Sequence, residues 1–153
     1  MDKLRVAAFG VFCRKRAETY ELLVQCPDSE EFYRFPGGTI EIGETASEAI
    51  VREMREEYEL DVVVDNLWVV SERFFVRQSQ QRHCISFLHF CSIEESDEFV
   101  ELRHKEHEDV KILWRSLGEL RRRLVYPEGI EKYFNFPTQQ IVHLISRSFK
   151  ETP

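Results

Sequence analysis

The sequence predicts an α+β fold in which a mixed β-sheet packs against one well-defined helix. Three observations predict it. The chain has 153 residues, which suffice for one domain with a hydrophobic core and are few for two. Several runs of β-branched and aromatic residues alternate with short polar segments, as strands alternate with turns. A single segment, beginning at Thr45, combines helix capping with helical periodicity. We therefore expect residues 1–153 to form one domain.

The first part of the chain is predicted to form strands joined by tight turns. Residues 4–13 and 20–26 are strand-like and are separated by a polar segment, which indicates a hairpin. Residues 32–35 and 39–42 are expected to be short extended pieces. Between them lies Pro36-Gly37-Gly38, where two glycines allow backbone angles that other residues resist.

The second part of the chain begins with the predicted helix, residues 45–59. Thr45 and Glu48 have the spacing of a capping box at its start. The later elements are predicted from periodicity. They are strands at 62–76 and 83–93, a polar loop at 94–109, a short strand at 111–114, a short helix at 117–124 and an amphipathic terminal helix at 138–149.

Charge and composition limit the possible partners. Lys and Arg number 21 and Asp and Glu number 28, so the formal net charge is −7. Such a chain has no general affinity for nucleic acid or anionic membranes, and we expect neither as a partner. Residues 4–13 are too short an apolar run for a membrane span or a signal peptide. The four cysteines form no C-x-x-C pair, so we expect free thiols and a cytoplasmic protein.

The predicted helix at 45–59 places three carboxylates on one side. At about 100° per residue, Glu56 and Glu57 lie about 60° and about 40° to either side of Glu53. A solvated face is the usual explanation of a Glu-rich helix. Here the same arc contains small and apolar residues that should face protein. Because like charges beside a core face need neutralisation, this arrangement indicates a cation, and hard divalent ions prefer oxygen ligands.

A longer pattern includes these carboxylates. It consists of Gly38, five residues, Glu44, seven residues, Arg52-Glu53, Met54, one residue, Glu56-Glu57, one residue, Glu59 and Leu60. The pattern resembles the Nudix box, the signature of the Nudix hydrolases, and the chain is similar to the MutT-like, single-domain members. The family has Gly where this chain has Glu59. Since that Gly ends the helix in a left-handed conformation, we expect a slightly different helix exit here.

The resemblance implies a fold, an activity and a metal site. The fold is the Nudix-type α/β/α sandwich, with a mixed sheet and the box helix against it. The activity is hydrolysis of a pyrophosphate bond in a nucleoside diphosphate linked to another group, with Mg²⁺ or Mn²⁺ as cofactor. The implied metal ligands are Glu53, Glu56 and Glu57, and Glu44 is expected at or near the metal.

Other roles also follow from the resemblance. Arg52 is expected to hold a box carboxylate in position by a charge-assisted hydrogen bond. Gly37 and Gly38 are expected to let the backbone approach the substrate, although a tight turn alone also explains them. The general base is expected to be a box glutamate or a loop glutamate, Glu106 or Glu108. Solvated loop charge explains each of the last two equally well.

The substrate and the partners are less defined by the sequence. One of five phenylalanines on the strands is available to stack on a base, and four arginines are available to meet phosphate, although core and surface positions are the commoner roles. They are Phe35, Phe74, Phe75, Phe87, Phe90, Arg34, Arg73, Arg77 and Arg82. We expect a small-molecule nucleotide as the partner and allow for a homodimer. The alternative to an enzyme is a Nudix-like sensor module that binds a nucleotide without cleaving it, and the intact box carboxylates favour catalysis.

Overall fold

The structure is a computed structural model that describes residues 3–93 and 99–151. Its elements follow one another in the order β1 (Leu4–Arg16), β2 (Thr19–Pro27), β3 (Gly37–Thr39), α1 (Ala46–Tyr58), β4 (Val62–Arg77), β5 (Gln80–Ile93), β6 (Glu101–Arg103), β7 (Val110–Ser116), α2 (Leu117–Leu120), the 3₁₀ helix η1 (Ile130–Tyr133) and β8 (Val142–Glu151). The strands predicted in the first hairpin, at 62–76, at 83–93 and at 111–114 are therefore confirmed.

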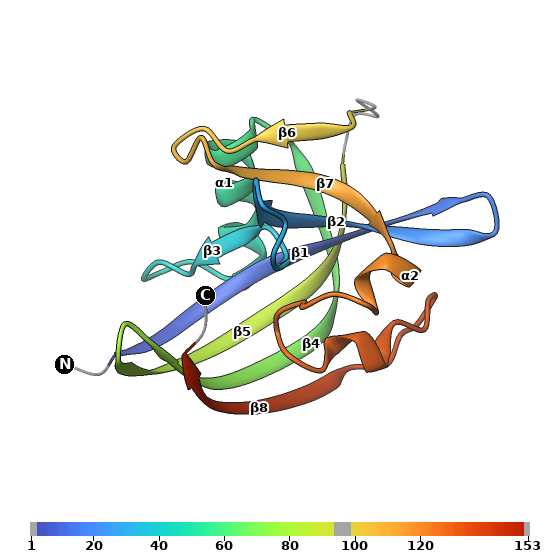
Figure 1. Cartoon of the computed structure of the whole chain (residues 1–153). Helices are drawn as coiled ribbons and strands as arrows, with labels where there is room; N and C mark the ends of the chain where they lie inside the picture. Colours follow the sequence, from blue (N-terminus) through green and yellow to red (C-terminus); the bar gives the residue numbers. More distant parts are fainter. Residues whose placement is uncertain (1–2, 94–98, 152–153) are drawn as a thin grey trace.

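The strands form one mixed, strongly curved sheet (Figure 1). Their order is β6-β7-β2-β1-β5-β4-β8, and β3 pairs with β1 beside this path. The pairs β1–β5 and β4–β8 are parallel, whereas β1–β2, β1–β3, β2–β7, β4–β5 and β6–β7 are antiparallel. The long strand β1 pairs with β3 and β5 along its first part and with β2 near its end, so it joins the two halves of the sheet.

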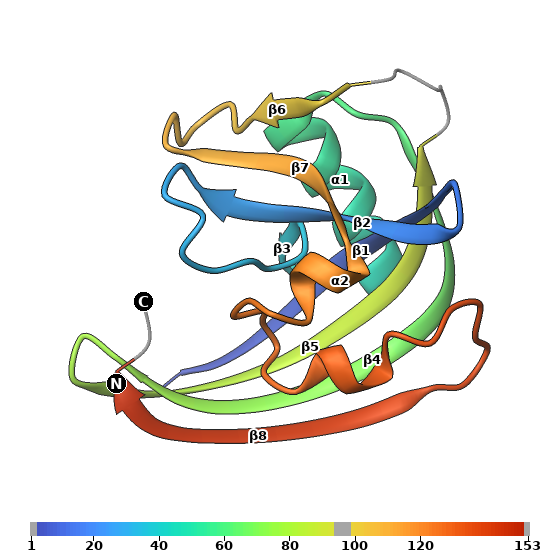
Figure 2. The ribbon, with the colours of Figure 1, turned by 45° about the vertical axis from the view of Figure 1, so that its right-hand side comes forward.

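Two hydrophobic cores lie on opposite faces of this sheet. One contains the buried side of α1, with Ile50 and Met54 packed against β1, β2 and β7 residues. The other contains Trp68 and Leu88 of the sheet, with buried residues of α2 and η1. Figure 2 shows α1 behind β2 and β7, whereas α2 lies in front of β1. The α+β class and the layered α/β/α arrangement are thus confirmed, with short helical segments forming the second outer layer.

The box helix begins as its sequence indicates, but its end differs from the expectation. Thr45 and Glu48 form a complete capping box, which satisfies backbone N–H groups that the first turn leaves unpaired. Ala49, Ile50, Met54 and Tyr58 are buried, as expected for an amphipathic helix. At the other end Glu59 adopts the left-handed conformation itself, with φ 54° and ψ 34°. The expected change in the helix exit is therefore not found, because Glu59 accepts the conformation that glycine would adopt more cheaply.

The predicted terminal helix at 138–149 is wrong. This part of the chain forms β8, which pairs in parallel with β4 from Val69 opposite Val142 to Phe74 opposite Arg147. Burial alternates along this strand. Leu144, for example, is buried, whereas its two neighbours are exposed. A period of two is the pattern of a strand with one covered face, and pairing with β4 satisfies one edge of its backbone. The strand forms one edge of the sheet.

Smaller differences concern the turns and loops. The strand expected at 39–42 lies slightly earlier, at Gly37–Thr39, where it pairs with β1. The predicted loop at 94–109 contains β6, and residues 94–98 of that prediction lie outside the described residues. The helix expected at 117–124 ends at Leu120. All four cysteines are free thiols, as predicted. In the described part of the chain, no helix has the length and apolar character needed to cross a bilayer.

Candidate active site

Two of the three box carboxylates line a cavity. The side chains of Glu53 and Glu57 are 14% and 16% exposed, whereas that of Glu56 is 56% exposed. The three carboxylates predicted to share one side of the helix therefore differ in their exposure to solvent. Burial, followed by the hydrogen bond and charge of neighbouring Glu53, raises the pKa of Glu57 to about 8. One buried oxygen of Glu57, Oε2, has no hydrogen-bond partner among the described residues.

Arg52 connects the box carboxylates. Its Nε donates to Glu44 Oε1 at 2.5 Å and its Nη2 to Glu44 Oε2 at 3.0 Å. Its Nη1 donates to Glu53 at 3.0 Å and to Glu56 at 3.2 Å. These hydrogen bonds keep the pKa of Glu44 below its ordinary value. A planar guanidinium with several fixed donors thus orients carboxylates from the helix and from the turn before it.

The glycines before the helix allow close packing around these carboxylates. Gly37 has φ +147°, and a Cβ there would collide with the backbone of Ala8 on β1. A Cβ on Gly38 would lie 2.5 Å from Glu53 Oε1. Both glycines also line the cavity. Glycine is therefore required by the backbone packing at Gly37, whereas a side chain at Gly38 would displace the Glu53 carboxylate. The lack of side chains also exposes backbone to the cavity.

A histidine that no sequence motif connects with the box contacts Glu57. His104 is buried, and its Nε2 lies 3.3 Å from Glu57 Oε1. Its Nδ1 accepts hydrogen bonds from the backbone N–H groups of Glu106 and His107, at 3.0 and 3.2 Å. Nδ1 is thus an acceptor, which places the proton of the neutral ring on Nε2, facing Glu57. Burial and the neighbouring His107 lower the pKa of His104, which favours this neutral form.

The loop glutamates occupy a different position from the box carboxylates. The side chains of Glu106 and Glu108 are exposed, and the described residues that line the cavity include neither of them. Glu106 is nevertheless close enough to raise the pKa of Glu57 by its charge. The loop is held to the end of α1 because the Lys105 N–H donates to the Glu57 carbonyl at 2.9 Å.

The cavity has a volume of about 330 Å³. Glu53, Glu57 and His104 line it, together with aromatic side chains that include Phe35, Phe75 and Tyr126. Of the arginines considered from the sequence, Arg34, Arg73 and Arg77 line this cavity, whereas Arg82 lines a second one. Arg5 and Gln25, which sequence reasoning did not single out, also line it. They lie on β1 and β2, and only the folded sheet brings them to the box helix.

The residues present suit a divalent cation. Glu53 and Glu57 offer adjacent carboxylate oxygens, the ligand type that Mg²⁺ and Mn²⁺ prefer. The unpartnered buried oxygen of Glu57 is the kind of group that a cation would satisfy. In the described residues no three acidic, histidine or cysteine side chains surround one point. Of the four expected ligands, Glu53 and Glu57 line the cavity and Glu44 and Glu56 do not, and Arg52 is hydrogen-bonded to Glu44, Glu53 and Glu56.

Comparison with known proteins agrees with this geometry. The 8-oxo-dGTP diphosphatase of Proteus vulgaris is 40% identical over 63 residues, which cover 39% of this chain and 54% of that protein. The chain thus spans about half the length of this curated relative. A NUDIX hydrolase from Nitrosomonas europaea superposes with a TM-score of 0.65 at 13% identity, covering 97% of this chain and 81% of the other. A MutT protein from Bacillus halodurans gives 0.61 at 14% identity, covering 94% and 89%.

These matches differ in what they establish. At such low identity the two solved structures show the fold alone. The sequence profile of the NUDIX domain, however, matches residues 3–135, which is most of the chain. This match includes the whole pattern from Gly38 to Leu60 and the strands on both sides of it. The chain therefore belongs to the Nudix domain family.

Proposed function

We propose that this chain hydrolyses a pyrophosphate bond in a nucleoside diphosphate linked to another group, and that it requires Mg²⁺ or Mn²⁺. The observation that carries the proposal is the pair of poorly exposed carboxylates, Glu53 and Glu57, that line one cavity together with arginines. A site with acidic groups for a cation and basic groups for phosphate suits an anionic substrate. The name of the Proteus vulgaris relative supports a nucleotide as that substrate.

Glu53 and Glu57 are the proposed principal metal ligands, and Glu56 and Glu44 are proposed to complete the site. A divalent cation bound there would offset charge on the phosphoryl oxygens and lower the pKa of a water molecule. Without such neutralisation, an anionic diphosphate would be repelled by the same carboxylates. Metal is therefore proposed as a requirement for hydrolysis, and it would also strengthen binding of the substrate.

The other residues are proposed to position these groups. Arg52 fixes the carboxylates by its hydrogen bonds to Glu44, Glu53 and Glu56. Gly37 and Gly38 let backbone approach the substrate. Glu106 is kept as a candidate general base, because the loop that carries it is docked beside Glu57.

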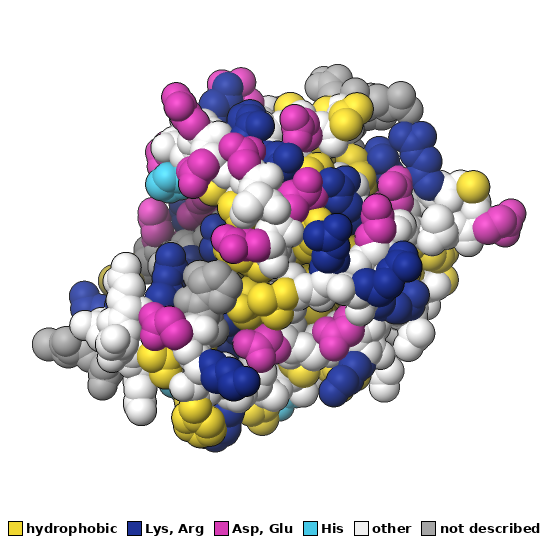
Figure 3. All heavy atoms as spheres, viewed as in Figure 1, with side chains coloured by type: hydrophobic (Ala, Val, Ile, Leu, Met, Phe, Trp, Pro, Cys, Tyr) yellow, Lys and Arg dark blue, Asp and Glu magenta, His cyan; other side chains and the backbone are white. Residues whose placement is uncertain are grey.

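The proposed partner is a small nucleotide. On the face shown in Figure 3, basic and acidic side chains are interspersed, without the continuous basic surface that bulk nucleic acid would require. The net charge of −7 supports the same choice. A cytoplasmic location is proposed with it, since four free thiols are typical of a reducing compartment.

The test is hydrolysis of a broad nucleotide panel in Mg²⁺ or Mn²⁺, with both products of pyrophosphate-bond cleavage measured, the nucleotide product and the phosphorylated other half of the substrate. We expect turnover that a chelator abolishes and that Glu57→Gln lowers at least about a hundredfold. Glu18→Gln is the matched control, because Glu18 is an exposed acid in the turn between β1 and β2. Tight binding of one nucleotide without turnover of any would favour the sensor module instead.

A further inference from the structure

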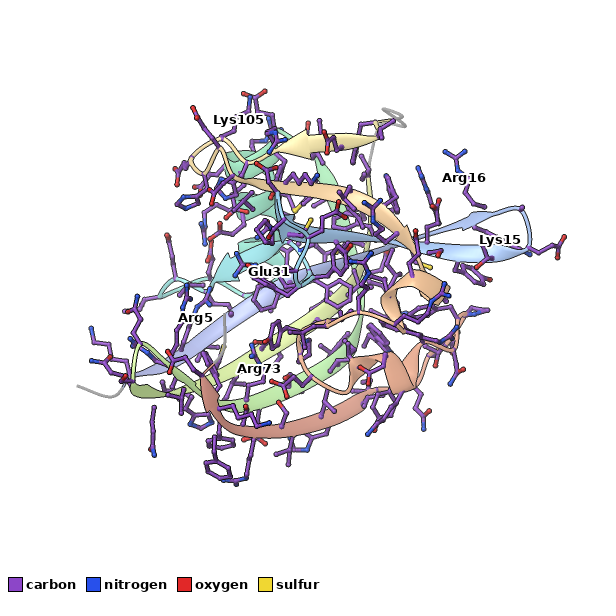
Figure 4. All side chains as sticks on the ribbon, viewed as in Figure 1. Arg5, Lys15, Arg16, Glu31, Arg73 and Lys105 are labelled. Atoms are coloured by element: carbon purple, nitrogen blue, oxygen red, sulfur yellow. The ribbon has the colours of Figure 1, made fainter. Side chains whose placement is uncertain are left out.

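Four arginines form a group in the cavity, here called the arginine cluster: Arg5, Arg34, Arg73 and Arg77. Arg5 is on β1, Arg73 and Arg77 are on β4, and Arg34 precedes β3. Figure 4 labels Arg5 and Arg73, which reach the same cavity from these two strands. Such a concentration of guanidinium groups is unusual in a chain with a net charge of −7.

Arg34 lines the cavity together with Glu57 and His104 and with the other arginines of the cluster. The positive charge of Arg34 influences the pKa values of Glu57, His104 and Arg73. Burial, followed by repulsion from Arg5 and Arg77, lowers the pKa of Arg34. The arginine cluster and the proposed metal ligands Glu53 and Glu57 therefore share one cavity.

Arg73 is held in a fixed orientation. Its guanidinium carbon lies 4.6 Å from the ring centre of Phe75 and 4.4 Å from that of Tyr126. Stacking on aromatic faces fixes the plane of the guanidinium and leaves its N–H donors at the edge. Among the described residues, no carboxylate forms an ion pair with Arg34 or Arg73, whereas Glu44, Glu53 and Glu56 all pair with Arg52.

The charges in the cavity indicate what the cluster binds. Two glutamates and four arginines line it. A divalent cation would cancel the charge of the two glutamates and leave the four positive charges of the cluster. A diphosphate substituted at both ends brings about one negative charge per phosphate, whereas an unsubstituted terminal phosphate brings about −1.5 to −2. A ligand that ends in a free phosphate thus matches the cluster better.

We infer that Arg34 and Arg73 form a phosphate subsite beside the metal-binding carboxylates, so that the chain prefers nucleotides with a free terminal phosphate, such as nucleoside triphosphates, over nucleoside diphosphates linked to a neutral group. The subsite would hold a phosphate by charge-assisted hydrogen bonds from planar guanidinium groups. The inference rests on the proposed function for its nucleotide, and on the geometry of the arginine cluster for the phosphate.

The first experiment measures binding without chemistry. Inorganic tripolyphosphate is titrated calorimetrically into the wild-type chain and into Arg34→Met, Arg73→Met and Arg82→Met, all in excess chelator. We expect about tenfold weaker binding for Arg34→Met and Arg73→Met, the scale of one lost charge-assisted contact. Arg82→Met is the control, because Arg82 lines a different cavity, and it should bind as the wild type does. Equal affinity in all four proteins would overturn the inference.

The second experiment compares kcat/KM for GTP and GDP-mannose in Mg²⁺. We expect the wild type to prefer GTP and Arg73→Met to lose at least about tenfold of that preference. An unchanged preference would overturn the subsite while leaving the proposed hydrolase intact. If no nucleotide of the broad panel is cleaved but tripolyphosphate binding still depends on Arg34 and Arg73, the proposed function fails and the subsite stands. Thermal unfolding checks each variant, and Arg77→Met, at an exposed position, replaces any variant that does not fold.

Discussion

The buried carboxylate of Glu57 makes a prediction about stability that needs no substrate. Its pKa in the folded chain is about 8, against an ordinary value of 4.5. Between these values the unfolded chain has released this proton while the folded chain retains it. Stability of the metal-free protein should therefore fall as the pH rises through this window and level off above pH 8. Glu57→Gln has no proton to lose, so we expect it to be more stable than the wild type at alkaline pH.

The size of this effect follows from the shift and from the surroundings. A rise from 4.5 to about 8 corresponds to an upper bound of about 5 kcal/mol, since each pKa unit is worth about 1.4 kcal/mol. The side chain is 16% exposed, and solvent and local rearrangement reduce the effect, so we expect about 2 kcal/mol. For a chain of this length, that free energy raises the unfolding temperature by about 4–8 °C.

The assay is thermal and urea unfolding of wild type and Glu57→Gln in excess chelator, from pH 4.5 to pH 9. The two proteins should differ little at pH 4.5 and most at pH 9. Mg²⁺ at pH 9 should stabilise the wild type more than the variant, because a ligand stabilises the state that binds it. A constant difference at all pH values, or a variant that is less stable at pH 9, would refute the reasoning about burial.

Three further predictions concern single residues. Glu59→Gly should stabilise the fold by about 1 kcal/mol, since glycine adopts the left-handed conformation without strain, and an unfolding temperature below that of the wild type would contradict this. His104→Asn keeps an acceptor near Nδ1 but has no donor near Glu57, so it should lower kcat about tenfold at similar KM. His104→Gln should keep most of the wild-type kcat. Equal rates for both variants would exclude a positioning role. Gly38→Ala should lower kcat at least about tenfold by displacing Glu53, with the unfolding temperature little changed, and unaltered kinetics would contradict the packing argument.

The box helix could be predicted because its information is local. Its capping box and its carboxylates lie within one short segment, and periodicity places them relative to one another. Periodicity does not predict that Glu56 is exposed to solvent while Glu57 is mostly buried. That difference arises because Glu56 pairs with Arg52 at the surface, while Glu57 faces His104, which belongs to a loop far along the chain.

The terminal strand and the cavity show where sequence reasoning is limited. The sequence of β8 predicts an amphipathic helix because a short apolar segment fits both the helical and the strand period, and pairing with β4 decides between them. Arg73 and Tyr126 are far apart in the chain, and only the fold stacks one on the other. No spacing rule connects such residues, so the metal end of the site is more predictable than the substrate end.

The most direct test of the proposed hydrolase is ³¹P NMR of GTP with the wild-type chain in Mg²⁺, repeated with excess chelator and with Glu53→Gln. Our account predicts new signals of a nucleoside monophosphate or diphosphate and of the released phosphate product, seen only when both the cation and the carboxylate are present. Perturbed GTP signals without any product, across GTP and the rest of the nucleotide panel, would show a binding module and contradict the account.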